Sequence, residues 1–299
     1  MPEPTVPFEK WQALGNDYVI VEERALPFEL TSARVARICA PHTGVGSDGV
    51  LVLSRPRGGD AVAALRIFNP DGSEAELSGN GAREAIMYLR RRGWTERDSF
   101  TLETAAGPVR PRITGAATCT VQMGRAATAS PFFPGGPADG RGEVDLAGAP
   151  APFRHVAIGN PQCAIALPDA AAVDALDLHA AGPAIERDAR FPARTNVSFY
   201  APLPSGGGAQ GAGHDGSRIR ARIFERGVGE TMSSGTGASG AAVAHVLAGG
   251  HPPVVVALDG GELSVDVSPE LDVTLTGWAV PVYRGELDPD FVKELHATE

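Results

Sequence analysis

Short apolar stretches recur along the chain and predict β-strands. Four of the clearest cover residues 8–23, 48–54, 63–69 and 155–167. In these segments apolar side chains either alternate with polar ones or run together for a few positions, which is typical of half-buried or fully buried strands. The chain is therefore expected to be rich in sheet.

Two longer segments favour helices instead. Residues 81–94 and 237–250 carry small and apolar residues at helical spacing, and both are long enough for a buried helix. Each follows a glycine-rich turn that begins with a serine, Ser78 in the first case and Ser234 in the second. Each half of the chain thus predicts strands, a glycine turn and one central helix.

The two turns belong to a longer internal repeat. When Arg66 is placed on Arg222, nine of the twenty positions that begin there are identical without a gap. Weaker matches in the same order extend the repeat upstream to "ALGND" and "AIGNP" and downstream of both helices. A spacing of about 155 residues is too long for a solenoid, so each copy should be a domain with its own core.

The repeat predicts an α+β fold of two pseudo-symmetric duplicated domains, each a mixed or antiparallel sheet wrapped around a central helix. A segment rich in Pro and Gly, residues 128–152, marks the connection between the copies. We assign residues 1–127 with 280–299 to an N-terminal domain and 128–279 to a C-terminal domain. The Gly-rich segment 202–217 is predicted to be a mobile surface loop.

Composition narrows the range of partners. The net charge is -10 and the pI about 5.2, so the basic surface that nucleic-acid binding requires is missing. The three cysteines follow neither a disulfide nor a zinc pattern, and no apolar stretch approaches the length of a membrane span. We expect a cytoplasmic protein that binds neither nucleic acid nor membrane, with no metal and no cofactor.

The repeated turn suggests an anion site. Backbone N–H groups at a helix N-terminus, with the positive end of the helix dipole behind them, bind carboxylates and stabilise developing oxyanions. The spacing fits neither the dinucleotide nor the P-loop pattern, so a small anion is the better expectation. Two such termini facing one another across a cleft between the domains suit a reaction in which one group removes a proton and the other delivers one to the opposite face.

Six motifs in order along nearly the whole chain resemble the diaminopimelate epimerase family. They are "LGND", "GVGSDG", "RIFNPDGSEAELSGNGAR", "GNPQC", "RTNVSF" and "ERGVGETMSSGTGA". The resemblance implies a cofactor-independent isomerase of two pseudo-symmetric domains, acting on a small amino acid. It implies the interconversion of LL- and meso-diaminopimelate in lysine and peptidoglycan precursor synthesis, carried out by two cysteines as thiolate base and thiol acid.

This chain has Ser78 and Ser234 at the two positions where the resemblance implies the catalytic cysteines. A thiol is far more acidic than a serine hydroxyl, which needs a general base to act. Three explanations stay open: engineered serines in an inactive protein, native serines with an altered mechanism or substrate, and a native binding module. Further departures at Glu84, Gln162 and Ser239 favour a native origin, since mutagenesis of two cysteines does not require them.

The resemblance also implies a substrate-binding set. Its members are Asn16, Asn69, Gly79, Asn80, Asn160, Asn196, Glu225, Arg226, Gly235 and Thr236. The four asparagines outside the loops are expected to bind the amino and carboxylate groups of the substrate. Glu225 and Arg226 are expected to bind its distal ammonium and carboxylate. The backbone N–H groups of the two loops are expected to bind the carboxylate at the reacting carbon. Gln162 stands where a histidine is implied, and Gly49 where some members have glutamine. Glu230, repeated as Glu74, is expected to be a structural partner of its helix.

Two alternatives to a diaminopimelate epimerase remain. One is a different cofactor-free isomerase or dehydratase of amino or hydroxy acids on the same scaffold. The other is an amino-acid-binding protein without turnover. The oligomeric state is left open by the sequence, with a homodimer as one option.

Overall fold

The computed structural model describes residues 5–204 and 216–298, so most of the predicted loop at 202–217 lies outside the described residues. The chain divides into two compact units. Unit 1 contains residues 1–121 and 277–299, and unit 2 contains residues 122–276. The domain boundaries predicted from the sequence differ from these by a few residues.

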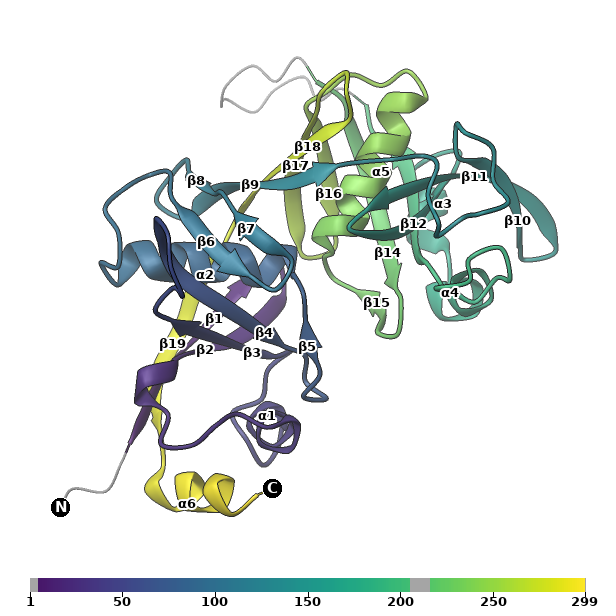
Figure 1. The fold of residues 1–299 in the computed structure, drawn as a ribbon. Helices are drawn as coiled ribbons and strands as arrows, with labels where there is room; N and C mark the ends of the chain where they lie inside the picture. The colour runs from purple at the N-terminus through teal and green to yellow at the C-terminus, as the bar shows by residue number, and fades with distance from the viewer. Residues whose placement is uncertain (1–4, 205–215, 299) are drawn as a thin grey trace. The chain divides into compact units, whose positions relative to one another are not determined.

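Unit 1 is built on a sheet in the strand order β19-β1-β2-β3-β4-β6-β7, with β5 paired to β4 (Figure 1). Its strands are β1 Val6–Ala13, β2 Asn16–Glu22, β3 Val50–Ser54, β4 Ala61–Phe68, β5 Glu74–Ala75, β6 Thr101–Thr104, β7 Gly107–Val109 and β19 Val280–Leu287. Its helical segments are η1 Glu23–Ala25, α1 Ser32–Cys39, α2 Gly79–Arg91 and α6 Pro289–Ala297. Pairs β2–β3 and β4–β6 are parallel and the others antiparallel, so the sheet is mixed.

The second sheet runs β10-β11-β12-β13-β14-β16-β17-β18-β9-β8, with β15 paired to β14. Its strands are β8 Arg112–Ile113, β9 Thr118–Arg125, β10 Arg141–Leu146, β11 Ala149–Ile158, β12 Asn160–Ala166, β13 Asn196–Pro202, β14 Arg218–Glu225, β15 Gly229–Thr231, β16 Val254–Leu258, β17 Gly261–Val267 and β18 Asp272–Trp278. The helices of unit 2 are α3 Ala170–Ala175, α4 Leu178–Glu186 and α5 Gly235–Leu247.

The two sheets repeat one topology. Strands β1-β2-β3-β4-β6-β7 of the first correspond in order to β11-β12-β13-β14-β16-β17 of the second, and β5 corresponds to β15. The parallel pairs recur as β12–β13 and β14–β16. Because parallel neighbours need a crossover connection, each copy places its central helix, α2 or α5, between the strands of the second parallel pair. The fold confirms the predicted α+β class and the duplication.

Both central helices are buried. All residues of α2 from Gly79 to Leu89 are buried, and α5 packs its small residues against β11 to β14, β16 and β17. A helix buried on every side must be apolar all round or carry polar groups with a special role. Helix α5 meets the first condition, whereas α2 buries Arg83 and Glu84 completely.

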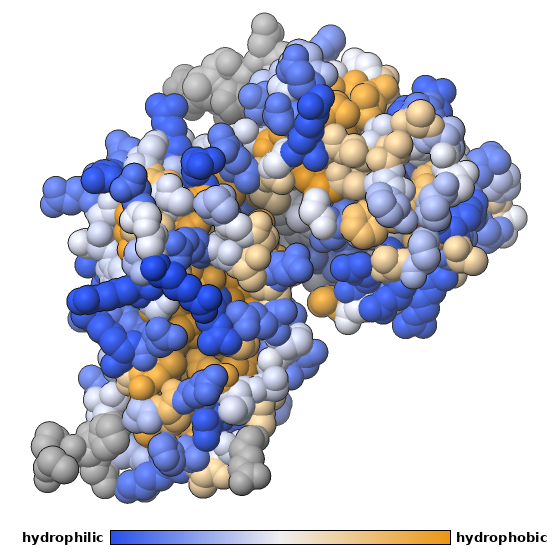
Figure 2. Space-filling model, in the orientation of Figure 1, coloured by the Kyte–Doolittle hydropathy of each residue, from blue (hydrophilic) through white to orange (hydrophobic). Residues whose placement is uncertain are grey.

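Each unit also has an apolar cluster away from its central helix. In unit 1, residues of α1, α6 and strands β1 to β3 pack together, with Ile38 and Leu295 fully or almost fully buried. In unit 2, α4 packs on its sheet through Leu178 and Ile185. Hydrophilic side chains cover much of the face shown in Figure 2, with smaller apolar areas between them. Among the described residues, no helix is long and apolar enough to cross a membrane.

Candidate functional site

Each central helix begins at its serine. Ser78 and Ser234 have extended backbone angles, and the hydroxyl oxygen of each accepts a hydrogen bond from the backbone N–H three residues later, Gly81 or Gly237, at 3.1 Å. Both serines are therefore helix N-caps, a role that Ser fills well. The cap uses the oxygen as an acceptor, and the O–H of each serine remains able to donate elsewhere.

The glycines after each serine let the helix start against its sheet. A Cβ on Gly81 would lie 3.0 Å from Leu51 Cδ2, and one on Gly237 would lie 2.7 Å from Ile223 Cδ1. Neither helix has an acidic residue in its first turn. The positive end of each helix dipole is thus not neutralised by its own helix, which is the condition for attracting a carboxylate.

A hydrogen-bonded chain of side chains lies beside the first loop. Asn80 Nδ2 donates to Asn16 Oδ1 at 3.2 Å, and Asn16 Nδ2 donates to Asp48 Oδ2 at 2.8 Å. On the other side, Arg83 Nη2 donates to Asn80 Oδ1 at 2.6 Å. The structure therefore brings together Asn16, Asn80 and the loop of Ser78, three members of the predicted set.

Arg83 adds positive charge directly behind this loop. Its Nη1 donates to Gly79 O at 3.0 Å, and burial lowers the pKa of the guanidinium to about 10, which still leaves it charged at neutral pH. The adjacent Glu84 is fully buried, and burial raises its pKa well above the usual value, although the charge of Arg83 and the backbone N–H of Tyr18 act in the opposite direction. Neither residue was in the predicted set.

A carboxyl group accompanies the second serine. Thr231 Oγ1 donates to Glu225 Oε1 at 2.8 Å, and the Ser234 hydroxyl lies near enough to the same carboxyl to help lower its pKa. Burial raises the pKa of Glu225, and these two hydroxyl groups offset part of that rise. The sequence analysis placed Glu225 at the far end of the substrate and missed this contact. Strand β14 pairs with β15 in a hairpin, and this hairpin returns the chain so that Glu225, at the end of β14, lies near Ser234.

The loop of Ser234 has side-chain neighbours similar to those of the first loop. Asn160 Nδ2 donates to Thr236 Oγ1 at 3.3 Å, as Asn80 and Asn16 are joined in unit 1. Gln162 Nε2 donates to Asn160 Oδ1 at 2.5 Å, while the buried Gln162 Oε1 has no partner. An amide at this position holds Asn160 but cannot exchange a proton as a histidine does.

The other predicted residues make local contacts. Asn196 Oδ1 accepts from the backbone N–H of Arg226 at 2.7 Å, and Arg226 Nη1 donates to Ala193 O at 2.9 Å. Asn69 donates to Ser73 Oγ at 2.9 Å within the turn after β4. The structure thus gathers Glu225, Arg226 and Asn196 at the end of β14, and its described contacts place Asn69 in a turn of its own.

Glu74 and Glu230 have the same role in both copies. Arg66 binds Glu74 at 2.9 Å, and Arg222 binds Glu230 at 2.5 Å, each pair joining neighbouring strands. Glu230 and Glu74 were predicted to be structural partners of the helices that follow them. The structural partner is instead a strand arginine.

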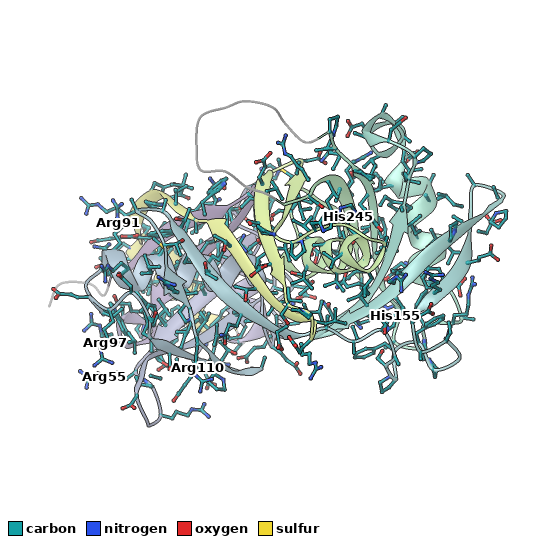
Figure 3. All side chains as sticks on the ribbon, turned by 90° about the horizontal axis from the view of Figure 1, so that it is seen from above. Arg55, Arg91, Arg97, Arg110, His155 and His245 are labelled. Carbon is teal, nitrogen blue, oxygen red and sulfur yellow. The ribbon has the colours of Figure 1, made fainter. Side chains whose placement is uncertain are left out.

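Within residues 5–204 and 216–298, the hydrogen bonds of Ser78 and Ser234 involve no histidine and no cysteine. In unit 2, His155 lies on β11 with its Nε2 2.8 Å from Ser130 Oγ, and His245 lies in the last turn of α5, far along the helix from Ser234 (Figure 3). All three cysteines are buried. Burial raises the pKa of Cys119 to about 12 and raises those of Cys39 and Cys163, so all three stay as thiols.

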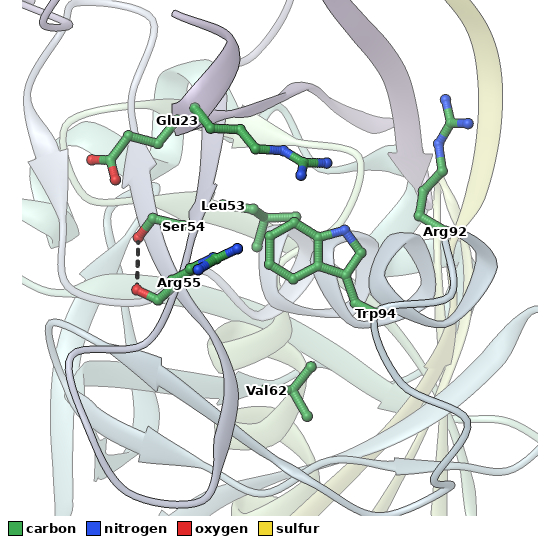
Figure 4. Close-up of a pocket in the computed structure, with 8 residues that line it drawn as sticks. Glu23, Leu53, Ser54, Arg55, Val62, Arg92 and Trp94 are labelled. Atoms are coloured by element: carbon green, nitrogen blue, oxygen red, sulfur yellow. Dashed lines mark hydrogen bonds between the residues drawn. The ribbon is translucent and has the colours of Figure 1, made fainter.

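A surface pocket of about 630 Å³ lies at the opposite end of α2 from Ser78 (Figure 4). Arg24, Arg55, Arg92 and Trp94 contribute to its lining. Arg24 is paired with Glu22 at 2.6 Å and Arg92 with Glu9, so much of its positive charge is already neutralised. Within the described residues there is no cluster of His, Cys, Asp and Glu that could hold a metal ion. In each unit the serine loop therefore remains the candidate site.

Known proteins match this chain over most of its length. The family model described as diaminopimelate epimerase matches residues 8–129 and 154–282. The diaminopimelate epimerase of Aromatoleum aromaticum is 36% identical over 288 residues, covering 95% of this chain and 99% of that one. The enzyme of the same name from an Azoarcus species is 37% identical over 286 residues, covering 94% and 98%.

A solved structure shares the fold at lower identity. The hydroxyproline epimerase of Agrobacterium vitis superposes with a TM-score of 0.65 over 97% of this chain and 95% of that one, at 16% identity. At that identity the likeness concerns the fold alone. The sequence matches extend over both copies of the repeat at more than a third identity, and they show that the chain belongs to the diaminopimelate epimerase family.

Proposed function

We propose that this protein interconverts LL- and meso-diaminopimelate by moving a proton at Cα, with Ser78 and Ser234 in the positions of the thiol pair. The two sequence relatives support the substrate, since both are named diaminopimelate epimerase. The observation that carries catalysis is the proximity of the Glu225 carboxyl to the Ser234 hydroxyl, at the end of the hairpin of β14 and β15. It provides the general base without which a serine hydroxyl is too weakly acidic to act.

Glu225 is suited to this task by its surroundings. A carboxylate of raised pKa is a stronger base than an ordinary one. In the proposed step the Cα proton passes to Ser234 Oγ while the Ser234 hydroxyl proton passes to Glu225. The ammonium-binding role that the resemblance implies for Glu225 is then shared with, or replaced by, this proton transfer.

Substrate binding in this proposal uses the helix N-termini. The backbone N–H groups of Gly79-Asn80 and Gly235-Thr236 hold the carboxylate at the reacting carbon and stabilise the charge that develops there. Asn16, Asn69, Asn160 and Asn196 bind the remaining polar groups near it. The Arg226 guanidinium binds the distal carboxylate as a fork. The buried charge of Arg83 supports anion binding at the first loop.

A cytoplasmic biosynthetic role and a homodimer are further parts of the proposal. The homodimer is supported by edge strand β19, on which Val282 and Tyr283 are 54% and 44% exposed. Large apolar side chains on an unpaired strand edge favour association. Light scattering after size-exclusion chromatography tests it, and a monomer mass at micromolar protein speaks against it.

The epimerase proposal is tested with LL-diaminopimelate in deuterated water. We expect deuterium at Cα together with the meso isomer, followed by mass spectrometry and chiral chromatography. The Ser78→Cys, Ser234→Cys double variant is expected to gain rate, because a thiol is more easily deprotonated. Absence of both exchange and inversion in the parent protein rules out the proposed activity.

An amino-acid-binding protein without turnover is the second candidate. The favouring observation is that both serines already serve as helix caps, a purely structural function. This candidate predicts calorimetric binding of diaminopimelate without isotope exchange at any pH. Turnover of another amino or hydroxy acid, with no exchange of diaminopimelate, instead identifies a different isomerase or dehydratase.

A further inference from the structure

Tyr18 contacts the hydroxyl of Ser78. The side chain comes from β2, is 5% exposed, and its phenol donates a hydrogen bond to Ser78 Oγ at 3.3 Å. The same oxygen also accepts from the Gly81 N–H. Ser78 thus has one acidic side chain directly on the atom that the proposed function places at the reacting carbon.

Gly49 makes room for this tyrosine. A Cβ on Gly49 would overlap the backbone oxygen of Phe68 and lie 2.6 Å from Tyr18 Cε1, in both cases closer than non-bonded atoms can approach, so a larger residue there would displace both the backbone and the ring. Gly49 is also where the family resemblance implies a glutamine in some members. The absence of a glutamine side chain at position 49 leaves room for the Tyr18 ring, whose hydroxyl contacts Ser78.

The corresponding position in unit 2 holds Gln162, which is two residues after Asn160 as Tyr18 is two residues after Asn16. Its amide donates to Asn160. The polar side chain near the Ser234 hydroxyl is instead the Glu225 carboxyl. The duplicated site is therefore asymmetric in chemistry: a phenol, which donates, accompanies one serine, and a carboxylate, which accepts, accompanies the other.

We propose that Tyr18 is the proton donor behind Ser78, an assignment that rests on the proposed function. The Ser78 O–H bond breaks as its hydrogen forms the new C–H bond with the carbanion at Cα. The Tyr18 O–H bond breaks in turn, its proton goes to Ser78 Oγ, and the electron pair stays on the phenolate. The proton taken from the other face is held by Glu225, and exchange of both groups with water restores the starting state. For the opposite isomer the steps run in reverse, beginning from the protein in which Tyr18 is the phenolate and Glu225 is protonated.

The test is Tyr18→Phe, which keeps the ring against Gly49 and removes only the hydroxyl. Rates of Cα deuterium exchange and of inversion are measured separately from the LL and the meso isomer. One isomer, whose proton is removed through Ser234 and Glu225, is expected to keep exchanging while its inversion falls about 100-fold. The other isomer is expected to lose exchange and inversion together, with KM changed little for both.

Tyr88→Phe is the matched control, because Tyr88 is equally buried in unit 1 and its hydroxyl binds Glu22 instead. The proposal is overturned if Tyr18→Phe inverts both isomers within about twofold of the parent rate. It is also overturned if exchange of both isomers falls alike, since that marks a merely structural hydrogen bond. A parent protein with no exchange disproves the proposed function itself, and the role of Tyr18 with it.

Discussion

At the scale of single residues, two oxygen atoms determine what this protein can do. A serine at a helix N-terminus has a hydroxyl of low acidity, and the helix dipole alone does not turn it into a base. The structure provides different partners, the Tyr18 phenol at Ser78 and the Glu225 carboxyl at Ser234. The chemistry of the site therefore depends on these neighbours as much as on the serines.

Glu225→Gln should abolish the base behind Ser234. We expect kcat to fall about 100-fold or more while the fold is retained, because the amide keeps the size of the side chain but cannot accept the proton. In the parent protein kcat/KM should rise with pH as Glu225 ionises. Since burial raises its pKa, that rise should lie above pH 4.5, the ordinary value for Glu.

The measurement is a pH profile of isotope exchange for both proteins. Glu143→Gln is the control, because Glu143 is an exposed residue of unit 2. A Glu225→Gln variant with the parent's rate and the parent's acid limb contradicts the role of this carboxyl.

At the scale of elements, the start of each central helix is set by contact with the sheet. Gly81 and Gly237 face strands β3 and β14, and the serine caps lie three residues before them. This arrangement presents the backbone N–H groups of the first turn, and it leaves no space for a Cβ at Gly237.

Gly237→Ala should therefore destabilise the protein although alanine favours helices. The added Cβ would lie 2.7 Å from Ile223 Cδ1, and overpacking of this kind costs about 1–3 kcal/mol. Chemical denaturation measures the loss in the free energy of unfolding. Gly58→Ala is the control, since a Cβ there meets nothing within 4 Å. Equal stability of the two variants contradicts the close contact.

At the scale of the whole molecule, a buried carboxyl should make stability depend on pH. Glu84 is fully buried, and this burial raises its pKa in the folded protein well above 4.5. The unfolded chain therefore releases this proton at lower pH than the folded protein does. Protonated Glu84 therefore contributes to the free energy of unfolding at low pH. This contribution is lost as the pH rises from the pKa of Glu84 in the unfolded chain toward its pKa in the folded protein.

Glu84→Gln should remove this loss of stability with rising pH, because glutamine does not ionise. The free energy of unfolding of the parent protein is expected to fall more steeply between pH 5 and pH 8 than that of the variant, as followed by denaturation at each pH. The exposed Glu76 of the same unit gives the control, Glu76→Gln. Identical pH dependence in Glu84→Gln and the parent contradicts a protonated Glu84 in the folded protein.

The sequence by itself determined the class of fold, the duplication and the start of both central helices. Strand and helix periodicity, helix caps and internal identity are local properties of the chain, so they can be read without coordinates. The correspondence of Ser78 with Ser234 came from the same identities. Family membership also followed from motifs in order along the chain.

Only the tertiary structure decided which side chains meet the serines. Tyr18 is 60 residues from Ser78, and it arrives there because β2 lies beside the start of α2. Glu225 reaches Ser234 through the hairpin of β14 and β15, and Tyr18 fits because Gly49 has no side chain. Such contacts depend on strand register and on packing across the sheet, which join distant residues, and no local pattern in the sequence encodes them.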